Sequence, residues 1–455
     1  MKIVVAGASG YIGRAVIPKL LEKFPQAEII ALSRSAQASD DPRITWKACE
    51  LFSLKSLEEA LPERADLALY LVHSMGPTAH LDQGSFADYD LILADNFARA
   101  VKKMNLTHLI YLGGLIPEGK KLSLHLQSRL EVEETFNQYH LPTTVFRAGL
   151  ILGEEGSSFQ ILLKLVKRLP IMICPSWTQN LTTPVDLTSV ISAISDVALE
   201  EKHIGKIYDL AGCQPLTYLD MMKETARKLG IKRRFFTVPF FTPTLSRSWV
   251  SLITNSPRNL VYPLIESLRT PMLPSESQIF SKEGLGFKYY DLLDRAQLKT
   301  HSGKSLFRFR AQRKTVRSVQ RLILPPGKDA EWIKNQYVHW LPKFLAPFIH
   351  VGLKGHTVVF SFLKNGPVFL ELNFSADRSQ ADRQLLYITG GFLAAPKNKG
   401  RLEFRTVLNR KYILAAIHEY NPALPWYFYR YSQAVVHLLV MRAFGRYLRR
   451  QLAAA

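Results

Sequence analysis

The sequence predicts an α/β protein in two parts, a doubly wound parallel sheet followed by a smaller α+β unit. Three observations support this. Apolar, strand-like runs alternate with amphipathic stretches in the first half, a glycine-rich turn follows the first strand, and from about residue 316 several strands precede one long terminal helix. A length of 455 residues also exceeds that of most single domains, so two domains are expected.

The first part begins with the strand "KIVVA", which ends at Gly7, and a helix from Tyr11 to about Lys23. The second strand is "EIIALS". Later strands are predicted at residues 66–72, 108–114 and 143–149. The helices between them are predicted from amphipathic stretches near residues 54–61, 87–104, 126–138 and 157–168. Strands that alternate with helices of this length form βαβ units, and the result is a parallel sheet with helices on both faces.

The net charge points to an anionic partner. Lys and Arg total 59, Asp and Glu total 38, and the net charge is +21. Such an excess attracts a phosphorylated cofactor, a nucleic acid or an acidic membrane surface, and it also serves plain solubility. The sequence contains no recognised nucleic-acid-binding motif, so a nucleic acid is not an expected partner.

The three cysteines, Cys49, Cys174 and Cys213, are far apart in the sequence. They form no CxxC pair, so neither a disulfide framework nor a zinc site is predicted, and no metal is expected. No apolar run approaches the roughly 18 residues of a spanning helix, and no signal peptide precedes the first strand. We therefore expect a cytoplasmic protein that can contact a membrane peripherally without crossing it.

The motif "GASGYIG" places Gly7, Gly10 and Gly13 between the first strand and the first helix. Gly7 permits the tight turn, Gly10 lets the backbone approach a pyrophosphate, and Gly13 permits close packing of the helix on the strand. Backbone N–H groups and the positive end of the helix then face the phosphates. In this βαβ context the motif predicts a dinucleotide-binding Rossmann fold, with a purely structural turn as the alternative.

The end of the second strand selects the cofactor. NAD-binding sites commonly have an acidic residue there, whereas this strand ends "ALSRS", with Arg34 and no carboxylate. A guanidinium group can donate two parallel hydrogen bonds to a phosphate, so Arg34 is predicted to bind the 2′-phosphate of NADP, with Ser33 as a further donor. The alternative is a surface arginine in solvent. NADP(H) is therefore expected in preference to NAD(H).

Five motifs follow one another over about residues 1–290: "GASGYIG", "LYLVHSMG", "LIYLGGLIPEG", "HLQSR" and "FRAGLILGEEGSSF". In this order they resemble the atypical short-chain dehydrogenase/reductase family with an NmrA-like, YbjT-type NAD(P)H-binding domain. The 39 kDa accessory subunit of respiratory complex I is a relative of the same kind. The resemblance implies dinucleotide binding but no particular reaction, because some members only bind the nucleotide.

By position, the resemblance also implies which residues hold the cofactor. Leu51 would lie near the adenine ring and Ala148 beside the nicotinamide amide. The nicotinamide ribose would be lined by Leu71, Val72, His73 and Ser74. The pyrophosphate would be held by Gly7, Ala8, Ser9, Gly10, Tyr11, Ile12 and Gly13. Asp186 resembles a residue on the substrate side, but it is equally suited to cap the next helix, and we favour the cap.

The catalytic positions depart from the family pattern. An active short-chain dehydrogenase uses a serine, a tyrosine and a lysine four residues after the tyrosine, and the last two positions here are His125 and Arg129. Arg129 keeps the positive charge and could bind ribose or phosphate, but it cannot release a proton. His125 could act as a general acid near neutral pH, and Arg129 would lower its pKa. Alternatively, both residues belong to a capped helix start without chemistry, and both interpretations stay open.

The serine of that pattern is replaced by Gly113-Gly114-Leu115, so the hydroxyl that orients a carbonyl has no direct counterpart. Ser74 and Ser123 are the candidates for it. His73 is a second histidine in the same predicted cleft, and it is equally interpreted as a packed histidine. The predicted catalytic pair is therefore His125 and Arg129, and the enzyme hypothesis depends on His125.

The domain boundaries follow changes in composition. The first domain is expected over residues 1–300, with a lobe at about residues 230–300. Within this lobe, residues 231–275 are rich in Pro, Phe, Trp and Arg. This lobe suits either a lipid headgroup interface or packing onto the Rossmann domain, and we favour the packing. A basic linker is expected at residues 301–315, and the second domain at residues 316–455.

The second domain is predicted to contain a strand, a helical stretch, five further strand-like runs and a helix from about Trp426 to Gln451. This order resembles the START-like helix-grip fold, in which a sheet wraps the last helix and leaves an apolar cavity. Basic residues gather near the end of that helix at Arg442, Arg446, Arg449 and Arg450. They either balance the helix dipole, which we favour, or belong to an amphipathic membrane helix.

Three functional hypotheses follow. The leading one is an NADP-dependent oxidoreductase that acts on a small apolar or quinone-like molecule. The second is a non-catalytic NADP(H)-binding sensor or assembly factor. The third is a membrane-surface, lipid-handling protein in which the nucleotide is structural. The sequence names neither the substrate nor the oligomeric state.

Overall fold

The structure is a computed structural model that describes residues 1–74, 81–119, 121–153, 155–238, 243–281, 287–295, 315–395 and 400–453. The chain forms two compact units. Unit 1 consists of Met1–Pro77 and Leu93–Arg308, and unit 2 of Thr78–Ile92 and Phe309–Ala455. The sequence predicts a continuous first domain, whereas the structure groups residues 78–92 with unit 2. Of the predicted linker at residues 301–315, all but Thr315 lies outside the described residues.

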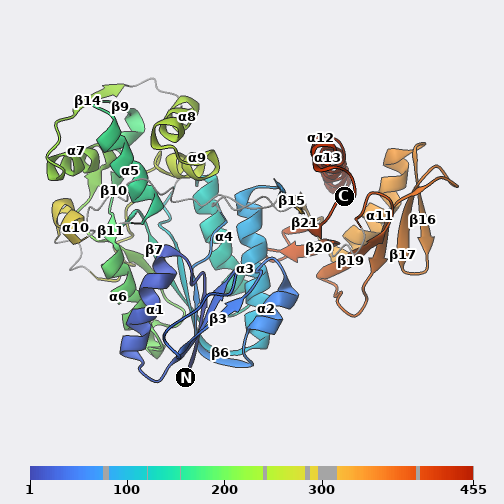
Figure 1. Cartoon of the computed structure of the whole chain (residues 1–455), viewed down its shortest axis with the longest axis horizontal. Helices are drawn as coiled ribbons and strands as arrows, with labels where there is room; N and C mark the ends of the chain where they lie inside the picture. Colours follow the sequence, from blue (N-terminus) through green and yellow to red (C-terminus); the bar gives the residue numbers. More distant parts are fainter. Residues whose placement is uncertain are drawn as a thin grey trace. The chain divides into compact units, whose positions relative to one another are not determined.

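Unit 1 is built on a seven-stranded sheet in the order β12-β7-β6-β4-β1-β2-β3, with all neighbours parallel (Figure 1). The strands are β1 (Lys2–Ala6), β2 (Glu28–Ser33), β3 (Ile44–Ala48), β4 (Arg64–Tyr70), β6 (Asn105–Gly114), β7 (Thr143–Ala148) and β12 (Ile207–Leu210). The predicted parallel, doubly wound sheet is confirmed. Strand order reverses between β1 and β4, and ligands of such sheets bind at this point, outside the carboxyl ends of the strands.

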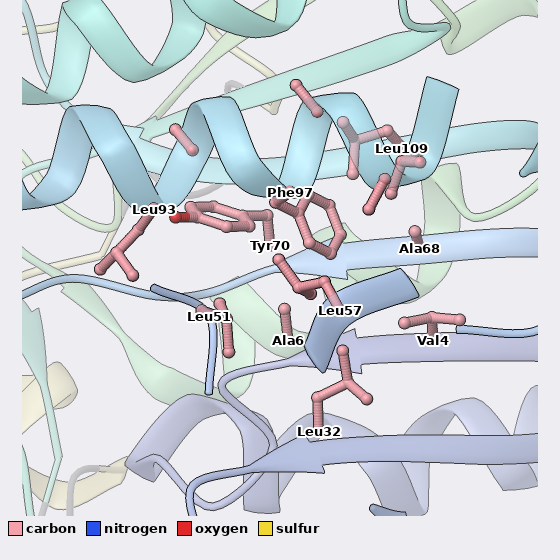
Figure 2. Packing of buried hydrophobic residues seen from close by; sticks show 14 of the residues in the cluster. Val4, Ala6, Leu32, Leu51, Leu57, Ala68, Tyr70, Leu93, Phe97 and Leu109 are labelled. Carbon is pink, nitrogen blue, oxygen red and sulfur yellow. The ribbon is translucent and has the colours of Figure 1, made fainter. Parts of the chain in front are cut away.

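Helices cover both faces of this sheet. One face packs against α1 (Tyr11–Lys23) and α6 (Leu187–Val197). The other packs against α2 (Leu54–Ala60), α3 (Phe86–Lys103) and α4 (Leu124–Gln138). Figure 2 shows Leu57, Tyr70 and Phe97 pointing into this second core. Most of these helices follow the apolar periodicity of the sequence, because they bury one stripe and leave the rest in solvent. Helix α3 is the exception, since every residue from Ala87 to Ala98 is buried.

The rest of unit 1 forms a lobe beyond the carboxyl edge of the sheet. Its helices are α5 (Ser157–Arg168), η1 (Ser176–Gln179), α7 (Tyr218–Lys228), α8 (Pro243–Thr254), α9 (Arg258–Ser267) and α10 (Tyr289–Arg295). The short helix η2 (Glu201–His203) lies instead at the amino edge, where the His203 carbonyl oxygen accepts a hydrogen bond of 2.6 Å from Thr144 at the start of β7. Its short strands are β8 (Ile151–Leu152), β9 (Ile171–Pro175), β10 (Leu181–Thr182), β11 (Val185–Asp186), β13 (Leu216–Thr217) and β14 (Arg234–Val238). Since α9 packs against α4, the predicted packing of this segment onto the Rossmann part is confirmed.

Unit 2 is an α+β unit with an eight-stranded sheet in the order β16-β17-β18-β19-β20-β21-β15-β5. Its strands are β5 (Leu81–Gln83), β15 (Val316–Ile323), β16 (Ile349–Lys354), β17 (Thr357–Phe362), β18 (Val368–Phe374), β19 (Arg383–Gly390), β20 (Arg401–Val407) and β21 (Tyr412–Tyr420). The neighbours are antiparallel except for β5, which runs parallel to β15. The helices α11 (Ala330–Leu345) and α13 (Gln433–Ala453) pack on the sheet with a shared apolar core.

The C-terminal helix differs from the prediction. Instead of one helix from Trp426 to Gln451, the structure has α12 (Trp426–Tyr431) followed by α13. Ser432 separates them with φ −120° and ψ −87°, a conformation outside the helical region. Within the described residues, no helix combines the length and the apolar character needed to cross a bilayer.

Candidate functional site

The glycines shape the turn between β1 and α1. Gly7 has a φ of +88°, which side chains rarely adopt, and a Cβ there would lie 2.9 Å from the carbonyl oxygen of Leu71. A Cβ at Gly13 would lie 2.4 Å from the carbonyl oxygen of Gly7 and 2.8 Å from Ala8 Cα. The predicted close packing of the helix at Gly13 is therefore confirmed, and valine or alanine cannot replace it without a shift of backbone.

The same turn leaves room for a phosphate. The helix α1 begins directly after Gly10, and no side chain caps its first turn. A Cβ at Gly10 would have only the Gly7 carbonyl oxygen within 4 Å, at 3.0 Å, so the other side of Gly10 is open. Ala8 is buried, and Ser9, Tyr11 and Ile12 are partly buried around this opening. An uncapped helix start beside an open, glycine-formed cradle fits the pyrophosphate of a dinucleotide.

The turn after β8 lies against this loop. The Arg14 guanidinium donates a hydrogen bond to the Ser9 carbonyl oxygen at 2.8 Å and forms an ion pair with Glu155. A Cβ at Gly153 would fall 1.8 Å from the Tyr11 hydroxyl oxygen, so the Tyr11 ring covers Gly153. Sequence analysis did not predict this contact. It makes the turn after β8 one wall of the candidate phosphate site.

The predicted adenosine-side residues lie at the ends of neighbouring strands. Ser33 is buried at the end of β2, where its hydroxyl donates to the Ser35 carbonyl oxygen. Arg34 follows it and is exposed. Leu51 packs in the core, and its carbonyl oxygen accepts a hydrogen bond of 2.9 Å from Asn96. Ser33 and Leu51 are thus engaged within the protein, which leaves Arg34 as the exposed member of this group.

The residues after β4 border the switch point of the sheet. Leu71 and Val72 are partly buried, Ser74 is partly buried, and His73 is exposed. The interpretation of His73 as a packed histidine is therefore wrong. The physical reason is that the chain has left the last buried position of β4, Tyr70, and enters the edge of the sheet where both helix layers end.

His125 lies in the first turn of α4 and meets a serine from α9. The helix is capped by Ser123, whose Oγ accepts a hydrogen bond of 3.3 Å from the Leu126 N–H. His125 Nδ1 lies 3.1 Å from Ser267 Oγ, and the two serine hydroxyls lie 2.8 Å apart. The predicted helix cap and a polar cluster are thus both present at the start of α4.

Burial lowers the pKa of His125 to about 3, and the positive charges of Arg129 and His73 act in the same direction. The predicted lowering by Arg129 is confirmed, although burial is the larger cause. A histidine with this pKa is neutral at pH 7. The prediction that His125 is a general acid near neutral pH is therefore corrected, because the imidazole does not carry the extra proton that such an acid releases.

Arg129 is buried one turn after His125. A Cβ at Gly114 would lie 3.4 Å from Arg129 Cγ, so the arginine stem covers the end of β6. Its carbonyl oxygen accepts a hydrogen bond of 3.0 Å from the Tyr111 hydroxyl. The two predicted catalytic residues thus lie on one face of α4, above the carboxyl end of β6.

A cavity of about 150 Å³ opens beside His125. Its floor includes Gly114 and Ala148, at the carboxyl ends of β6 and β7. Its walls are mainly apolar side chains from the helices of the lobe, among them Ile161, Leu162, Met222, Val250, Val261, Leu264 and Ile265. Such a cavity suits a small apolar ligand that is oriented by few polar groups.

The polar groups of this cavity are neutral donors or acceptors. Trp177 lines it, and the indole Nε1–H is buried with no hydrogen-bond partner in the described part of the chain. Tyr218 also lines it, and burial raises the pKa of its hydroxyl to about 12, so the phenol stays protonated. His125, Ser158 and Ser267 complete the set. A buried N–H without a partner is costly, and a ligand oxygen would satisfy it.

Two further predictions concern residues outside this cavity. Asp186 caps α6, with a carboxylate oxygen that accepts a hydrogen bond of 3.0 Å from the Ser189 N–H, so the favoured structural role is confirmed. All three cysteines are buried, and burial raises the pKa values of Cys49 and Cys174 to about 11 and of Cys213 to about 12. Among the described residues, no group of three or more His, Cys, Asp or Glu side chains is arranged to hold a metal ion.

Sequence reasoning missed Ser267, Trp177 and Tyr218. His125 and Ser267 are 142 positions apart, and neither "IESLR" nor "PSW" carries a recognisable motif. No local pattern could have found these residues, because they line one cavity with His125 only after the lobe has folded over the sheet edge. Ser123, one of the two predicted hydroxyl candidates, does belong to the cluster, through Ser267.

Residues 3–155 match the NAD dependent epimerase/dehydratase family. A curated relative, the auxiliary protein GraX of Staphylococcus aureus, is 31% identical over 115 residues, which is 25% of this chain. The chain spans only 36% of the length of that relative.

Solved structures show the same fold. The NADP(H) complex of Citrobacter sp. triphenylmethane reductase is similar with a TM-score of 0.51 and 18% identity, over 65% of this chain and 99% of that chain. The NADPH complex of the Escherichia coli quinone oxidoreductase QOR2 is similar with a TM-score of 0.50 and 16% identity, also over 65% and 99%. Together with the sheet order, these findings show that unit 1 has the Rossmann fold of NAD(P)-binding epimerases and reductases.

Proposed function

We propose that unit 1 is an NADP(H)-dependent oxidoreductase that reduces a small apolar substrate carrying an oxygen acceptor, such as a quinone. The observation that supports it most directly is the apolar cavity of about 150 Å³ beside Gly114 and Ala148, with His125 in its wall. The triphenylmethane and quinone reductases named above share the fold. They lend support by analogy, since a fold by itself does not define a reaction.

The cofactor would lie along the carboxyl edge of the sheet. The cradle at Gly7, Gly10 and Gly13 would hold the pyrophosphate through backbone N–H groups, and the exposed Arg34 would contact the 2′-phosphate of NADP. In a parallel sheet, all strand ends on this edge lie together. The reactive ring would therefore lie toward β6 and β7, next to the cavity.

His125 is suited to hold a substrate oxygen rather than to deliver a stored proton. The single proton of the Ser267 hydroxyl has three neighbours: the Pro263 carbonyl oxygen at 3.0 Å, Ser123 Oγ at 2.8 Å and His125 Nδ1 at 3.1 Å. If Ser267 donates to Nδ1, the neutral imidazole carries its proton on Nε2 and can donate it to an oxygen in the cavity. A neutral imidazole donor stabilises negative charge that develops on that oxygen.

The opposite tautomer of His125 results when the Ser267 hydroxyl donates its hydrogen bond to a different acceptor. If Ser267 donates to Pro263, then Nδ1 must carry the proton and donate to Ser267 Oγ, and Nε2 becomes an acceptor. This second form would accept a hydroxyl proton from a reduced substrate. When bound, NADPH supplies the hydride, and one proton from solvent completes the reduction of a carbonyl to an alcohol or of a quinone to a hydroquinone. Trp177 Nε1–H would bind a second acceptor of the substrate.

The test is NADPH oxidation with a panel of quinones, aldehydes and triarylmethane dyes. Wild-type protein should oxidise NADPH with at least one apolar acceptor. His125→Asn should lower kcat by about 10- to 100-fold, because it removes one oriented hydrogen-bond donor from the transition state. The NADPH dissociation constant should stay within about threefold, since His125 lies at the cavity and not at the glycine turn.

His140→Asn is the matched control. His140 is exposed, and its φ of 52° suits asparagine, so this variant should keep wild-type kinetics. If NADPH binds but neither wild type nor variant turns over any acceptor, the enzyme proposal fails. The alternative, a nucleotide-binding sensor or assembly factor, would then account for the loss of the usual Ser-Tyr-Lys set.

Unit 2 is proposed to be a START-like helix-grip domain, because its antiparallel sheet packs on the C-terminal helix α13. The centroid of the Tyr337 ring, on α11, lies 5.4 Å from that of Phe404 on β20 and 5.2 Å from that of Phe444 on α13. An apolar ligand in this place would have to displace these contacts. Titration with a fluorescent fatty acid tests such binding; saturable binding that Phe404→Trp abolishes would support a ligand site here.

A further inference from the structure

The solvent face of the last two helices is unusual in its composition. Tyr427, Phe428 and Tyr431 on α12 are 80%, 66% and 67% exposed, and on α13 Val435, Val436 and Leu439 are 44%, 51% and 54% exposed. A soluble surface rarely gathers this many large apolar side chains on consecutive turns. They are not needed for the core, because α13 packs on the sheet with other residues, among them Val440, Met441, Phe444 and Leu448.

Arginines continue the same stripe. On α13 the exposed positions run Val435, Leu439, Arg442, Arg446 and Arg449, at intervals of three or four residues, which places them along one helix face. The first half of this face is apolar and the second half cationic. With 21 residues, α13 is about 30 Å long, so the stripe is longer than a small-molecule site.

The charge of this segment has one sign. From Asn421 to the last residue the sequence contains five arginines and no acidic residue. The helix dipole accounts for cations in the last turn of α13 but not for Arg442 and Arg446, because its effect fades within one turn. The dipole also gives no reason for the exposed tyrosines and leucine. The interpretation favoured at the level of sequence therefore explains only part of the pattern.

We propose that this stripe, formed by the solvent faces of α12 and α13, docks unit 2 on an anionic lipid bilayer. Aromatic and aliphatic side chains would enter the interface between headgroups and acyl chains, where tyrosine and phenylalanine are favoured, while the arginines bind lipid phosphates. Charge complementarity selects this partner: an acidic surface matches a stripe with arginines and no carboxylates. The docking is peripheral and independent of the reaction proposed for unit 1.

Vesicle flotation of the full chain tests the proposal. Wild-type protein should float with phosphatidylcholine vesicles that contain phosphatidylglycerol and should bind pure phosphatidylcholine at least about tenfold more weakly. Added salt should weaken the binding, since exposed charges are screened. Arg442→Gln with Arg446→Gln should reduce binding to the anionic vesicles by about tenfold or more.

The apolar half is tested separately. Tyr431→Ser with Leu439→Ser should also weaken binding by about tenfold, because less apolar surface leaves water. The matched controls are Leu252→Ser and Arg64→Gln, which change exposed residues of unit 1 and should bind like wild type. All substituted positions are exposed, so an unchanged melting temperature verifies folding in each variant.

A fluorophore reports the contact directly. The native cysteines are buried, so a single Val436→Cys can be labelled with an environment-sensitive dye. The emission should shift to the blue on anionic vesicles, and a dye at Leu252→Cys should not respond. Absence of wild-type binding, or stripe variants that bind as wild type does, overturns the proposal. A change of sedimentation coefficient in the stripe variants without vesicles also overturns it, because the stripe is then a contact between copies.

Discussion

The glycine turn and the apolar cavity of unit 1 are built in opposite ways. The turn consists of consecutive residues, Gly7 to Gly13, and works through backbone conformation and open space. The cavity takes its walls from α4, α5, η1, α7, α8 and α9, and works through side chains. A single added Cβ can distort the turn, whereas the cavity can lose one apolar contact and remain a cavity. The turn is therefore expected to tolerate substitution less well than the cavity.

The largest effect is expected in the turn. Gly13→Val places a Cβ 2.4 Å from the Gly7 carbonyl oxygen and 2.8 Å from Ala8 Cα, so the turn must move. NADPH affinity should fall by at least about 100-fold, because the pyrophosphate loses oriented backbone donors. Calorimetric titration measures this. Ala15→Val adds the same branching to α1 away from the turn, and if it weakens NADPH equally, the loss reflects helix propensity and not the turn.

The second prediction concerns His108, a buried histidine of unit 1 that lies outside the cavity. His108 is fully buried; its Nδ1 accepts from the Leu199 N–H at 3.1 Å, and its Nε2 lies 2.8 Å from Thr144 Oγ1. Burial lowers the pKa of His108 to about 4. The unfolded chain, with a histidine pKa of about 6.5, binds this proton first as the pH falls. Protonation therefore favours unfolding between about pH 6.5 and 4, and stability is retained above this range.

When the pH falls from 7 to 5, the preferential protonation of His108 in the unfolded chain should lower the free energy of unfolding of unit 1 by about 2 kcal/mol. Urea unfolding at both pH values, for wild type and His108→Gln, isolates the contribution. The difference between the two pH values should shrink in the variant. An unchanged pH dependence would mean that His108 is as easily protonated in the folded protein as in solution.

The third prediction concerns a substitution that makes the cavity smaller. Leu264 is partly buried and lines the cavity, so Leu264→Trp should extend into it and raise KM for an apolar acceptor by about tenfold. NADPH affinity should not change. Leu252→Trp, at an exposed position of α8, is the control for the added aromatic ring. If NADPH affinity falls in parallel with KM, the turn and the cavity are not separate sites.

The smallest effect is expected at Arg34. This residue is exposed, so solvent weakens its contact with a phosphate, and Arg34→Gln should reduce NADPH affinity by about fivefold. NADH affinity should stay the same, because NADH has no 2′-phosphate. Competitive titration of the two cofactors gives the ratio. Equal losses for both would show that Arg34 holds another part of the nucleotide.

Local patterns were sufficient for most of unit 1. Apolar runs and their spacing predicted most strands and helices of the sheet, because buried parallel strands are continuous apolar runs and helices repeat with their own period. The parallel order followed from the alternation of strand and helix, and the glycine turn followed from three residues in one loop. The same approach missed β3, β5 and β16. Strand β5 has three residues and pairs with β15, which is distant in sequence, whereas β16 pairs with the next strand, β17, in a hairpin.

The sequence by itself determined the Rossmann scaffold and its glycine turn. The turn depends only on residues close together in the chain, since a Cβ at Gly13 would collide with Gly7 and Ala8. It also showed that His125 and Arg129 stand where a tyrosine and a lysine are usual. Only the tertiary structure decided what surrounds His125. The folding of the lobe brings Ser267 to its Nδ1, removes water and lowers its pKa, and these effects depend on residues 142 positions away that no local pattern connects.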